Sequence, residues 1–260
     1  MKNKIGVGLL TYNRPEYYKR VLFSIPKHKI DHLVVVNDGN FSYAQDDHAD
    51  KVFLTKKQAG VSVCKNLLLK ELLKKGCTHI FLIEDDNLII HPDVFEVYIN
   101  TANYYGVHHL AYERLTRTEE TVKASYKDPN SEYGLDFFHN AEAGFTYIHA
   151  NLINKYGFFD ENYFNAFEHV DFTYNLVKNK VAPPFWYFPD VLNSNYYILE
   201  IPNSLNNSSI TNKPGYNENV EKSAKHFIKK WGIFTNQIPQ VSVLELKASL
   251  KYLKSTYQIK

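Results

Sequence analysis

Short apolar runs alternate with helical or loop-like segments through the first 84 residues, and this order constrains the fold more than any other feature. The runs predict buried strands at 4–11, 32–36, 51–54 and 80–83. Pro15 opens a helix that extends to about residue 24, and Gly76 ends a strong helix over 60–75. Strands that alternate with helices in this way predict an α/β fold, with a mostly parallel sheet and helices on both faces.

The later part of the chain is less regular. A further helix is expected from Pro92, whereas the polar segment 106–140 is expected to be a loop. The remaining elements are predicted as a strand at 142–149, helices at 151–156 and 170–178, and mostly irregular chain at 181–217.

Charge and cysteine content exclude several classes of protein. The formal net charge of +2 gives no general attraction to nucleic acid. Cys64 and Cys77 lack the spacing of a zinc site or a disulfide framework, and neither a signal peptide nor a membrane-spanning run is recognisable. These features predict a cytoplasmic protein that is soluble or attached peripherally to the inner face of the membrane.

Residues 218–260 are expected to form a basic helical extension. Eight lysines against Glu221 and Glu245 give residues 221–260 a charge of +6. The apolar stripe of the last helix, over 240–260, consists of Val243, Leu246, Leu250, Leu253 and Tyr257. This helix either packs back onto the preceding domain or makes a contact with a second copy, a partner or a membrane surface.

Three consecutive carboxylates, Glu84, Asp85 and Asp86, follow the fourth predicted strand directly. Like charges this close repel one another unless a cation compensates them, and a divalent metal with oxygen ligands is the usual cation. The alternative is a solvated acidic turn. Because open α/β sheets bind their ligands at strand-to-helix connections of this kind, the position favours a site for Mn²⁺ or Mg²⁺.

Two other strand ends should lie on the same rim of the sheet. Thr11-Tyr12-Asn13-Arg14 follows the first strand, and Asp38-Gly39 follows the second. A nucleotide sugar would suit a crevice between these groups. Asp38 can accept the N3–H of a pyrimidine, the acidic residues can hold ribose hydroxyls and a metal, and Arg14 and Lys65 can add positive charge at the diphosphate.

These motifs, taken in order, resemble those of family-2 glycosyltransferases of the GT-A fold, of the bacterial surface-polysaccharide type. Glu84-Asp85-Asp86 takes the place of the family's Asp-x-Asp motif, and Cys64-Lys65 stands in place of Ala-Arg. The resemblance covers about residues 4–180. The segments that carry it are 6–15, 34–39, 60–66, 83–87 and 157–161.

The resemblance implies roles for individual residues. Asp86 would bind the metal, while Glu84 and Asp85 would contact the ribose or the sugar. The full set of implied donor-binding residues is Thr11, Asn13, Arg14, Asp38, Lys65, Glu84 and Asp85.

The role of general base has three candidates. Segment 167–172 takes the place of the family's Glu-Asp motif, but His169 occupies the position of the usual Asp. Inverting transfer needs one base near the acceptor hydroxyl, and we prefer Asp171, then Glu168, then His169. Either acid could instead simply cap a helix. Further histidines that could bind metal are His139, His149 and His226.

Two segments are candidates for contacts with the substrates. Phe185, Trp186 and Tyr187 form either an acceptor wall or part of the hydrophobic core. Ser208-Ser209-Ile210 is expected to belong to a lid over the donor.

The sequence therefore predicts an inverting, metal-dependent glycosyltransferase that moves a sugar from a nucleotide sugar, foremost a UDP-sugar, to a surface glycan such as capsule or lipo-oligosaccharide. Residues 1–217 would form the catalytic domain, with the nucleotide-sugar half at 1–105 and the acceptor half at 106–217. One alternative is a sugar nucleotidyltransferase, which would need a glycine-rich loop after the first strand. The other is a non-catalytic nucleotide-sugar-binding module of a larger polymerase, which the His169 departure keeps open.

Overall fold

A six-stranded sheet in the order β3-β2-β1-β4-β9-β6 forms the centre of the computed structural model, which describes residues 3–39, 48–55, 57–113, 122–140, 144–204 and 206–258. The four strands that run parallel are β1 (Ile5–Thr11), β2 (His32–Asn37), β3 (Lys51–Leu54) and β4 (His79–Glu84). β9 (Phe145–His149) runs antiparallel to both of its neighbours, β4 and β6 (His109–Ala111). The prediction of a mostly parallel α/β sheet is confirmed.

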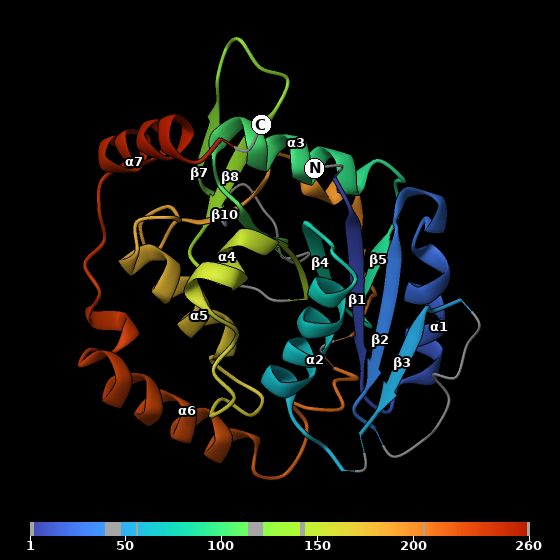
Figure 1. Cartoon of the computed structure of the whole chain (residues 1–260). Helices are drawn as coiled ribbons and strands as arrows, with labels where there is room; N and C mark the ends of the chain where they lie inside the picture. The colour runs from blue at the N-terminus through green and yellow to red at the C-terminus, as the bar shows by residue number, and fades with distance from the viewer. Residues whose placement is uncertain are drawn as a thin grey trace.

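Helices cover both faces of this sheet, and Figure 1 shows α1 and α2 on opposite sides of β1 to β3. On one face lie α1 (Pro15–Ser24) and α3 (Val94–Tyr105). On the other lie α2 (Val61–Lys74), α4 (Ala150–Tyr156) and α5 (Glu168–Lys178). The strands are apolar on both sides because each face packs against a helical layer.

Glycine in β1 lets α2 approach the sheet closely. Val7 and Leu9 point to the α1 face, whereas Gly6 and Gly8 alternate with them and face α2. A Cβ atom on Gly8 would lie 2.9 Å from the Cβ of Leu68. The close packing of α2 on the sheet therefore depends on the missing side chain.

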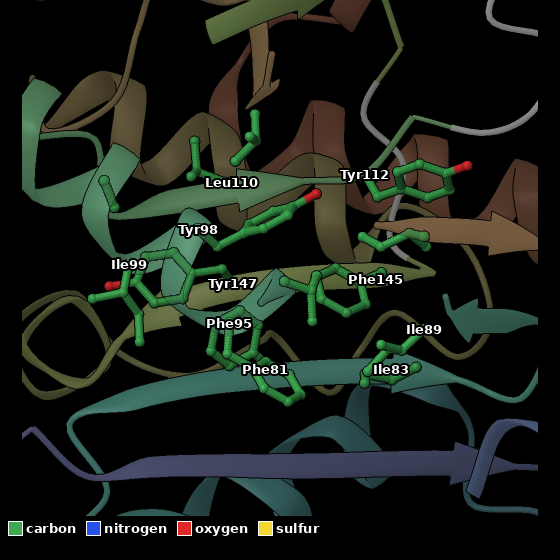
Figure 2. Packing of buried hydrophobic residues seen from close by; sticks show 14 of the residues in the cluster. Phe81, Ile83, Ile89, Phe95, Tyr98, Ile99, Leu110, Tyr112, Phe145 and Tyr147 are labelled. Carbon is green, nitrogen blue, oxygen red and sulfur yellow. The ribbon is translucent and has the colours of Figure 1, made fainter. Parts of the chain in front are cut away.

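Aromatic side chains fill the core beneath α3. The ring of Phe81 on β4 lies 4.7 Å from that of Phe95 and 5.1 Å from that of Tyr147, centroid to centroid (Figure 2). Edge-to-face and tilted contacts of this kind stabilise the fold beyond the contribution of the apolar area that they bury. Core packing thus accounts for a large share of the aromatic residues.

Two smaller antiparallel sheets complete the fold. One pairs β10 (Phe188–Val191), β8 (Gly134–Phe138) and β7 (Val122–Lys127), and the other pairs β11 (Ile198–Glu200) with β5 (Asn87–Ile89).

The prediction of a loop over 106–140 is wrong, because β6, β7 and β8 lie within it. The sequence of β7 shows no apolar run, because its side chains are half-buried or exposed. In β8 the buried Asp136 interrupts the apolar run, and it accepts a hydrogen bond of 2.5 Å from the hydroxyl of Ser125.

Other boundaries differ by a few residues. The helix expected from Pro92 begins at Val94, and the helix expected at 170 begins at Glu168. The strand expected from Glu142 begins at Phe145, and Glu142 itself lies outside the described residues. The expected irregular segment 181–217 contains β10, where Pro189 is tolerated because β10 is an edge strand.

The C-terminal part consists of α6 (Tyr216–Trp231) and α7 (Val243–Thr256). Leu246, Leu250 and Leu253 of α7 are buried in the same hydrophobic cluster as the side chains of α1 and α3. Packing onto the domain therefore accounts for the leucine stripe. Within the described ranges, no helix combines the length and apolar character needed to span a bilayer.

Candidate active site

A cavity of about 190 Å³ lies at the carboxyl ends of β1, β2 and β4. These strand ends bring together Thr11, Asp38 and the acidic residues that follow β4, as the sequence predicted. The full lining is Leu10, Thr11, Tyr12, Arg14, Asp38, Val61, Glu84, Asp85, Asp86, Asn165, Glu168, Ser204, Ser208, Ser209, Ile210, Thr211 and Tyr216.

Arg14 holds two of the three consecutive acids. Its guanidinium forms an ion pair with Asp85 and lies 3.3 Å from Oδ2 of Asp86. Burial by itself lowers the pKa of Arg14, but attraction to the two carboxylates outweighs burial, and the pKa is raised. Arg14 is therefore a fixed positive charge between Asp85 and Asp86.

Asp85 is the most deeply buried of the three acids. Burial raises its pKa to about 7 against the opposing effect of Arg14, and the hydroxyl of Thr11 donates a hydrogen bond of 2.6 Å to Oδ2. Since Asp85 is held by Thr11 and Arg14, it organises the end of β1.

Asp86 and its neighbour form the next part of the wall. Oδ1 of Asp86 accepts a hydrogen bond of 2.7 Å from the side-chain amide of Asn87, which is fully buried. The backbone N–H of Ile201 donates to the carbonyl of Asp86 at 2.7 Å. These contacts fix the direction of the Asp86 carboxylate.

Asp38 joins the end of β2 to the start of α2. Its oxygens accept hydrogen bonds from the hydroxyl of Thr55 at 2.8 Å and from the backbone N–H groups of Ala59 at 2.7 Å and Gly60 at 3.0 Å. Burial raises the pKa of the adjacent Cys64 thiol, and the charge of Asp38 adds to this effect. Asp38 thus lines the cavity and also organises it.

Asn13 is outside the cavity lining and supports it from behind. Its φ of +53° is one that Asn tolerates better than most residues. A Cβ atom on Gly39 would lie 2.9 Å from the backbone nitrogen of Asn13, so a side chain there would force the backbone of this turn to shift.

Lys65 is buried behind the wall rather than exposed on it. Its Nζ lies 3.0 Å from Oε1 of Glu84 and 3.2 Å from Oε1 of Glu168, and 2% of its side chain is exposed. The sequence suggested a lysine at the diphosphate, whereas the structure places it between two carboxylates that do line the cavity.

The three candidate bases lie in different surroundings. Glu168 is the first residue of α5 and lines the cavity. His169 is outside the cavity lining, and its ring lies 5.2 Å from that of His109. Burial lowers the pKa of His169 far below its usual value, with smaller effects from His109 and Lys65. His169 is therefore neutral and part of the packing.

Asp171 also lies outside the cavity lining. Its oxygens accept hydrogen bonds from Tyr163 at 3.1 Å, from Lys230 at 2.7 Å and from the indole of Trp231 at 2.7 Å. These contacts join α5 to α6.

Among the described residues that line the cavity, carboxylates outnumber positively charged groups. Within the described residues, no three His, Cys, Asp or Glu side chains are grouped so as to hold a metal by themselves. Mg²⁺-like sites, however, commonly use one or two carboxylates plus the phosphates of the substrate. Asp86, with its carboxylate fixed at the cavity, fits such a site.

The segment 206–216 forms another side of the cavity. The hydroxyl of Ser209 donates a hydrogen bond of 2.8 Å to the carbonyl of Tyr12. The Nζ of Lys213 contacts the hydroxyl of Tyr12, lies 4.0 Å from the centre of its ring, and donates to Gln58 at 3.1 Å. The predicted lid residues Ser208 to Ile210 thus lie at the cavity.

Of the two placements considered for residues 185–187, an acceptor wall or the core, the structure has them packed in the core. Phe185 and Tyr187 are buried, and the indole of Trp186 donates a hydrogen bond of 2.8 Å to the carbonyl of Ile238. None of the three is in the cavity lining.

The other histidines have local roles. His149 accepts a hydrogen bond from the backbone of Asn151 at the start of α4, and His226 lies 3.0 Å from Asp160. His139 is exposed, and none of these three lines the cavity.

Several lining residues were missed from the sequence. Asn165, Ser204, Thr211 and Tyr216 reach the cavity from the turn before α5 and from the segment leading into α6. A polar loop carries no periodicity that shows where it folds back, so no local signal identified them.

No protein-family profile matches the chain. A relative named as an uncharacterized glycosyltransferase, from Acanthamoeba polyphaga mimivirus, is 25% identical over 244 residues, which cover 87% of this chain and 93% of the relative.

Two solved structures share the fold. A mannosyltransferase from Pyrobaculum calidifontis, in complex with GDP-Man and Mn²⁺, matches 97% of this chain and 70% of its own with a TM-score of 0.57 and 14% identity. GalNAc-T7 with UDP, GalNAc and Mn²⁺ matches 96% of this chain with a TM-score of 0.64 and 10% identity, and the match spans 54% of the GalNAc-T7 chain. These likenesses show that the chain has the GT-A glycosyltransferase fold.

Proposed function

We propose that this protein is an inverting, metal-dependent glycosyltransferase that moves a sugar from a nucleoside-diphosphate sugar to a hydroxyl group of a glycan. The observation that carries the proposal is that Asp86 and Glu168 line the same cavity, at the ends of β1, β2 and β4. One carboxylate is suited to a metal and the other to a proton, as this reaction requires.

The comparisons support the donor class. The mannosyltransferase structure contains GDP-Man and Mn²⁺, and the GalNAc-T7 structure contains UDP, GalNAc and Mn²⁺. We propose a UDP-sugar as the donor, with Asp38 and Thr11 at the nucleoside, and a surface glycan such as capsule or lipo-oligosaccharide as the acceptor.

Asp86 is the residue that we assign to the metal, Mn²⁺ or Mg²⁺. A bound divalent ion would neutralise charge on the leaving diphosphate and help to orient the donor. Arg14 holds Asp85 and Asp86 in place beside it. The excess of acidic groups in the cavity is the physical reason to expect a cation there.

Glu168 is the residue that we assign as general base. As the acceptor oxygen forms its bond to the anomeric carbon, the proton of that hydroxyl passes to the Glu168 carboxylate. The bond between the anomeric carbon and the diphosphate oxygen breaks at the same time, and its electron pair leaves with the nucleoside diphosphate. One displacement of this kind inverts the anomeric configuration.

Glu168 is preferred over the two other candidates because of position. Asp171 is engaged by Tyr163, Lys230 and Trp231. His169 lies beside His109 in the interior. A base must be within hydrogen-bond reach of the acceptor, and of the three Glu168 is the one in the cavity lining.

The experiment is to incubate the protein with UDP-sugars and GDP-sugars, with and without Mn²⁺, and to measure nucleotide release. Release from one donor that falls by about 100-fold or more in Glu168→Gln or Asp86→Asn supports the proposal. Glu96→Gln, an exposed acid in the first turn of α3, is the matched control and should keep full activity.

Two other outcomes would point elsewhere. Formation of pyrophosphate from a sugar phosphate and UTP would identify a nucleotidyltransferase. Tight nucleotide binding without turnover, with glycan acceptors present, would identify a binding module.

A further inference from the structure

Lys65 connects two elements that both contribute to the cavity. The lysine is in α2, and its ammonium lies within 3.2 Å of Glu84 at the end of β4 and of Glu168 at the start of α5. A lysine is rarely buried this deeply unless it is paired, and the two carboxylates provide the pairing.

Two carboxylates are counter-charges of Lys65. Among the described residues, the charged and titratable groups that interact with it include Glu84 from β4, Glu168 and His169 from α5, His109 from β6 and the neighbouring Cys64. Burial lowers the pKa of His109 to about 3, and the charge of Lys65 adds to this effect. Both histidines are therefore neutral beside the ammonium.

The lysine keeps its charge in this position. Burial alone would lower the pKa of Lys65, but attraction to Glu84 and Glu168 outweighs burial, so the pKa is raised. A permanent ammonium ion thus separates two acids that would otherwise repel each other at the cavity wall.

Glu168 is anchored by one of its two oxygens. Oε1 is the atom near Lys65, and among the contacts recorded for the described residues Oε2 has no partner. Since Glu168 lines the cavity, Oε2 is available to take a proton while Oε1 holds the side chain in one rotamer.

We propose that Lys65 is a positioning residue, which fixes the Glu168 carboxylate at the cavity and ties it to Glu84, and that Lys65 is not a ligand of the donor diphosphate. This inference rests on the proposed function, in which Glu168 is the general base. Without the ammonium, Glu84 and Glu168 would repel each other, and Glu168 would turn away from its place at the cavity.

The first test separates positioning from donor binding. Lys65→Met should lower kcat by about 100-fold while the Kd for UDP with Mn²⁺, measured by calorimetry, changes by no more than about twofold. Lys70→Met is the matched control, because Lys70 lies on the same helix, is exposed, and within the described part of the chain pairs with Glu161 at a distance of 3.5 Å.

Two results would overturn the proposal. One is a Kd that weakens by about tenfold with kcat unchanged, which would make Lys65 a donor ligand. The other is a kcat equal to that of Lys70→Met.

The conservative variant covers the case in which Lys65→Met does not fold. Lys65→Arg keeps the positive charge, so it should retain activity well above that of an uncharged replacement. Its kcat should change by a larger factor than its Kd for UDP. The longer arginine side chain would displace its direct partner Glu168, whereas it would not touch the donor. The reverse order would overturn the proposal.

A stability cycle tests the contact without any turnover. In the cycle of Lys65→Met, Glu168→Gln and the double variant, the double variant should be less destabilised than the sum of the single changes. If the changes in the free energy of unfolding are additive, Lys65 and Glu168 are not coupled and the proposal is overturned. If the wild type releases no nucleotide from any donor, the proposed function fails, yet this cycle still decides whether Lys65 and Glu168 are coupled.

Discussion

Lys230 of α6 lies 2.7 Å from the carboxylate of Asp171 in α5, and this contact explains why Asp171 is not at the cavity. The adjacent Trp231 donates a second hydrogen bond to the same carboxylate. The acid that the sequence favoured as the base therefore joins two helices. Glu168, three residues earlier, is the acid that lines the cavity.

Asp171→Asn should lower the free energy of unfolding but have little effect on the rate of nucleotide release. The change weakens a buried contact with three donors, so we expect a loss of about 1–3 kcal/mol in the free energy of unfolding. Thermal melting followed by circular dichroism would show this as a lower Tm, by about 2–4 °C for each kcal/mol. Glu168→Gln removes a counter-charge of the buried Lys65 and should also lower the Tm, but unlike Asp171→Asn it should lose nearly all nucleotide release while still folded. An inactive Asp171→Asn with an unchanged Tm would contradict this assignment.

Removal of divalent metal should abolish nucleotide release. Since the cavity has more carboxylates than cations, a donor diphosphate would meet net repulsion without a metal ion. Treatment with EDTA should weaken UDP binding by about tenfold or more in calorimetry, and added Mn²⁺ should restore it. Asp86→Asn should lose this response, whereas Asp93→Asn, at a half-buried acid outside the cavity lining, should keep it. Equal affinity for UDP with and without metal would rule out the assigned role of Asp86.

Acidification should destabilise the fold through its buried histidines. Burial lowers the pKa of His79 to about 4 and that of His109 and His149 to about 3. The unfolded chain takes up these protons below about pH 6.5, whereas the folded chain does not. The contribution to stability is therefore complete above that pH and is lost as the pH falls toward 4.

The variant His149→Asn tests this directly. His149 caps the start of α4 by accepting a hydrogen bond of 3.2 Å from Asn151, and Asn is itself a favourable capping residue. The difference in Tm between pH 7.5 and pH 5 should be smaller in the variant than in the wild type. An unchanged difference would show that His149 does not contribute to the pH dependence.

Nucleotide binding should order the segment 206–216. The contacts of Ser209 and Lys213 with Tyr12 tie this segment to the end of β1. UDP with Mn²⁺ should slow cleavage by thermolysin before Ile210 by about tenfold. Lys213→Met should speed this cleavage in the absence of nucleotide, and Lys222→Met, in α6, is the control. Equal cleavage rates with and without UDP would exclude a role for this segment as a lid.

The first part of the fold, up to β4, followed from local signals. β1, β2 and β4 are continuous apolar runs, and the helices between them begin or end at Pro15 and Gly76. These features depend on neighbouring residues in the chain, so periodicity and turn chemistry were sufficient to predict them.

The remaining features depend on contacts between distant residues. The partner of Asp171 is 59 residues later in the chain, and the partners of Lys65 lie in β4 and α5. Neither the burial of Lys65 nor the engagement of Asp171 has a local signature. For the same reason β8, whose buried Asp136 is satisfied by Ser125 of β7, could not be identified from its own sequence.

The position of α7 has a consequence for how the protein is made. Leu246, Leu250 and Leu253 complete a hydrophobic cluster whose other members begin with Val7 in β1. This core therefore cannot close while residues 243–256 are still being synthesised, although the strands that carry the acidic residues have already emerged. During that interval the α3 face of the nascent chain exposes apolar surface, which is a binding site for chaperones and a risk for aggregation.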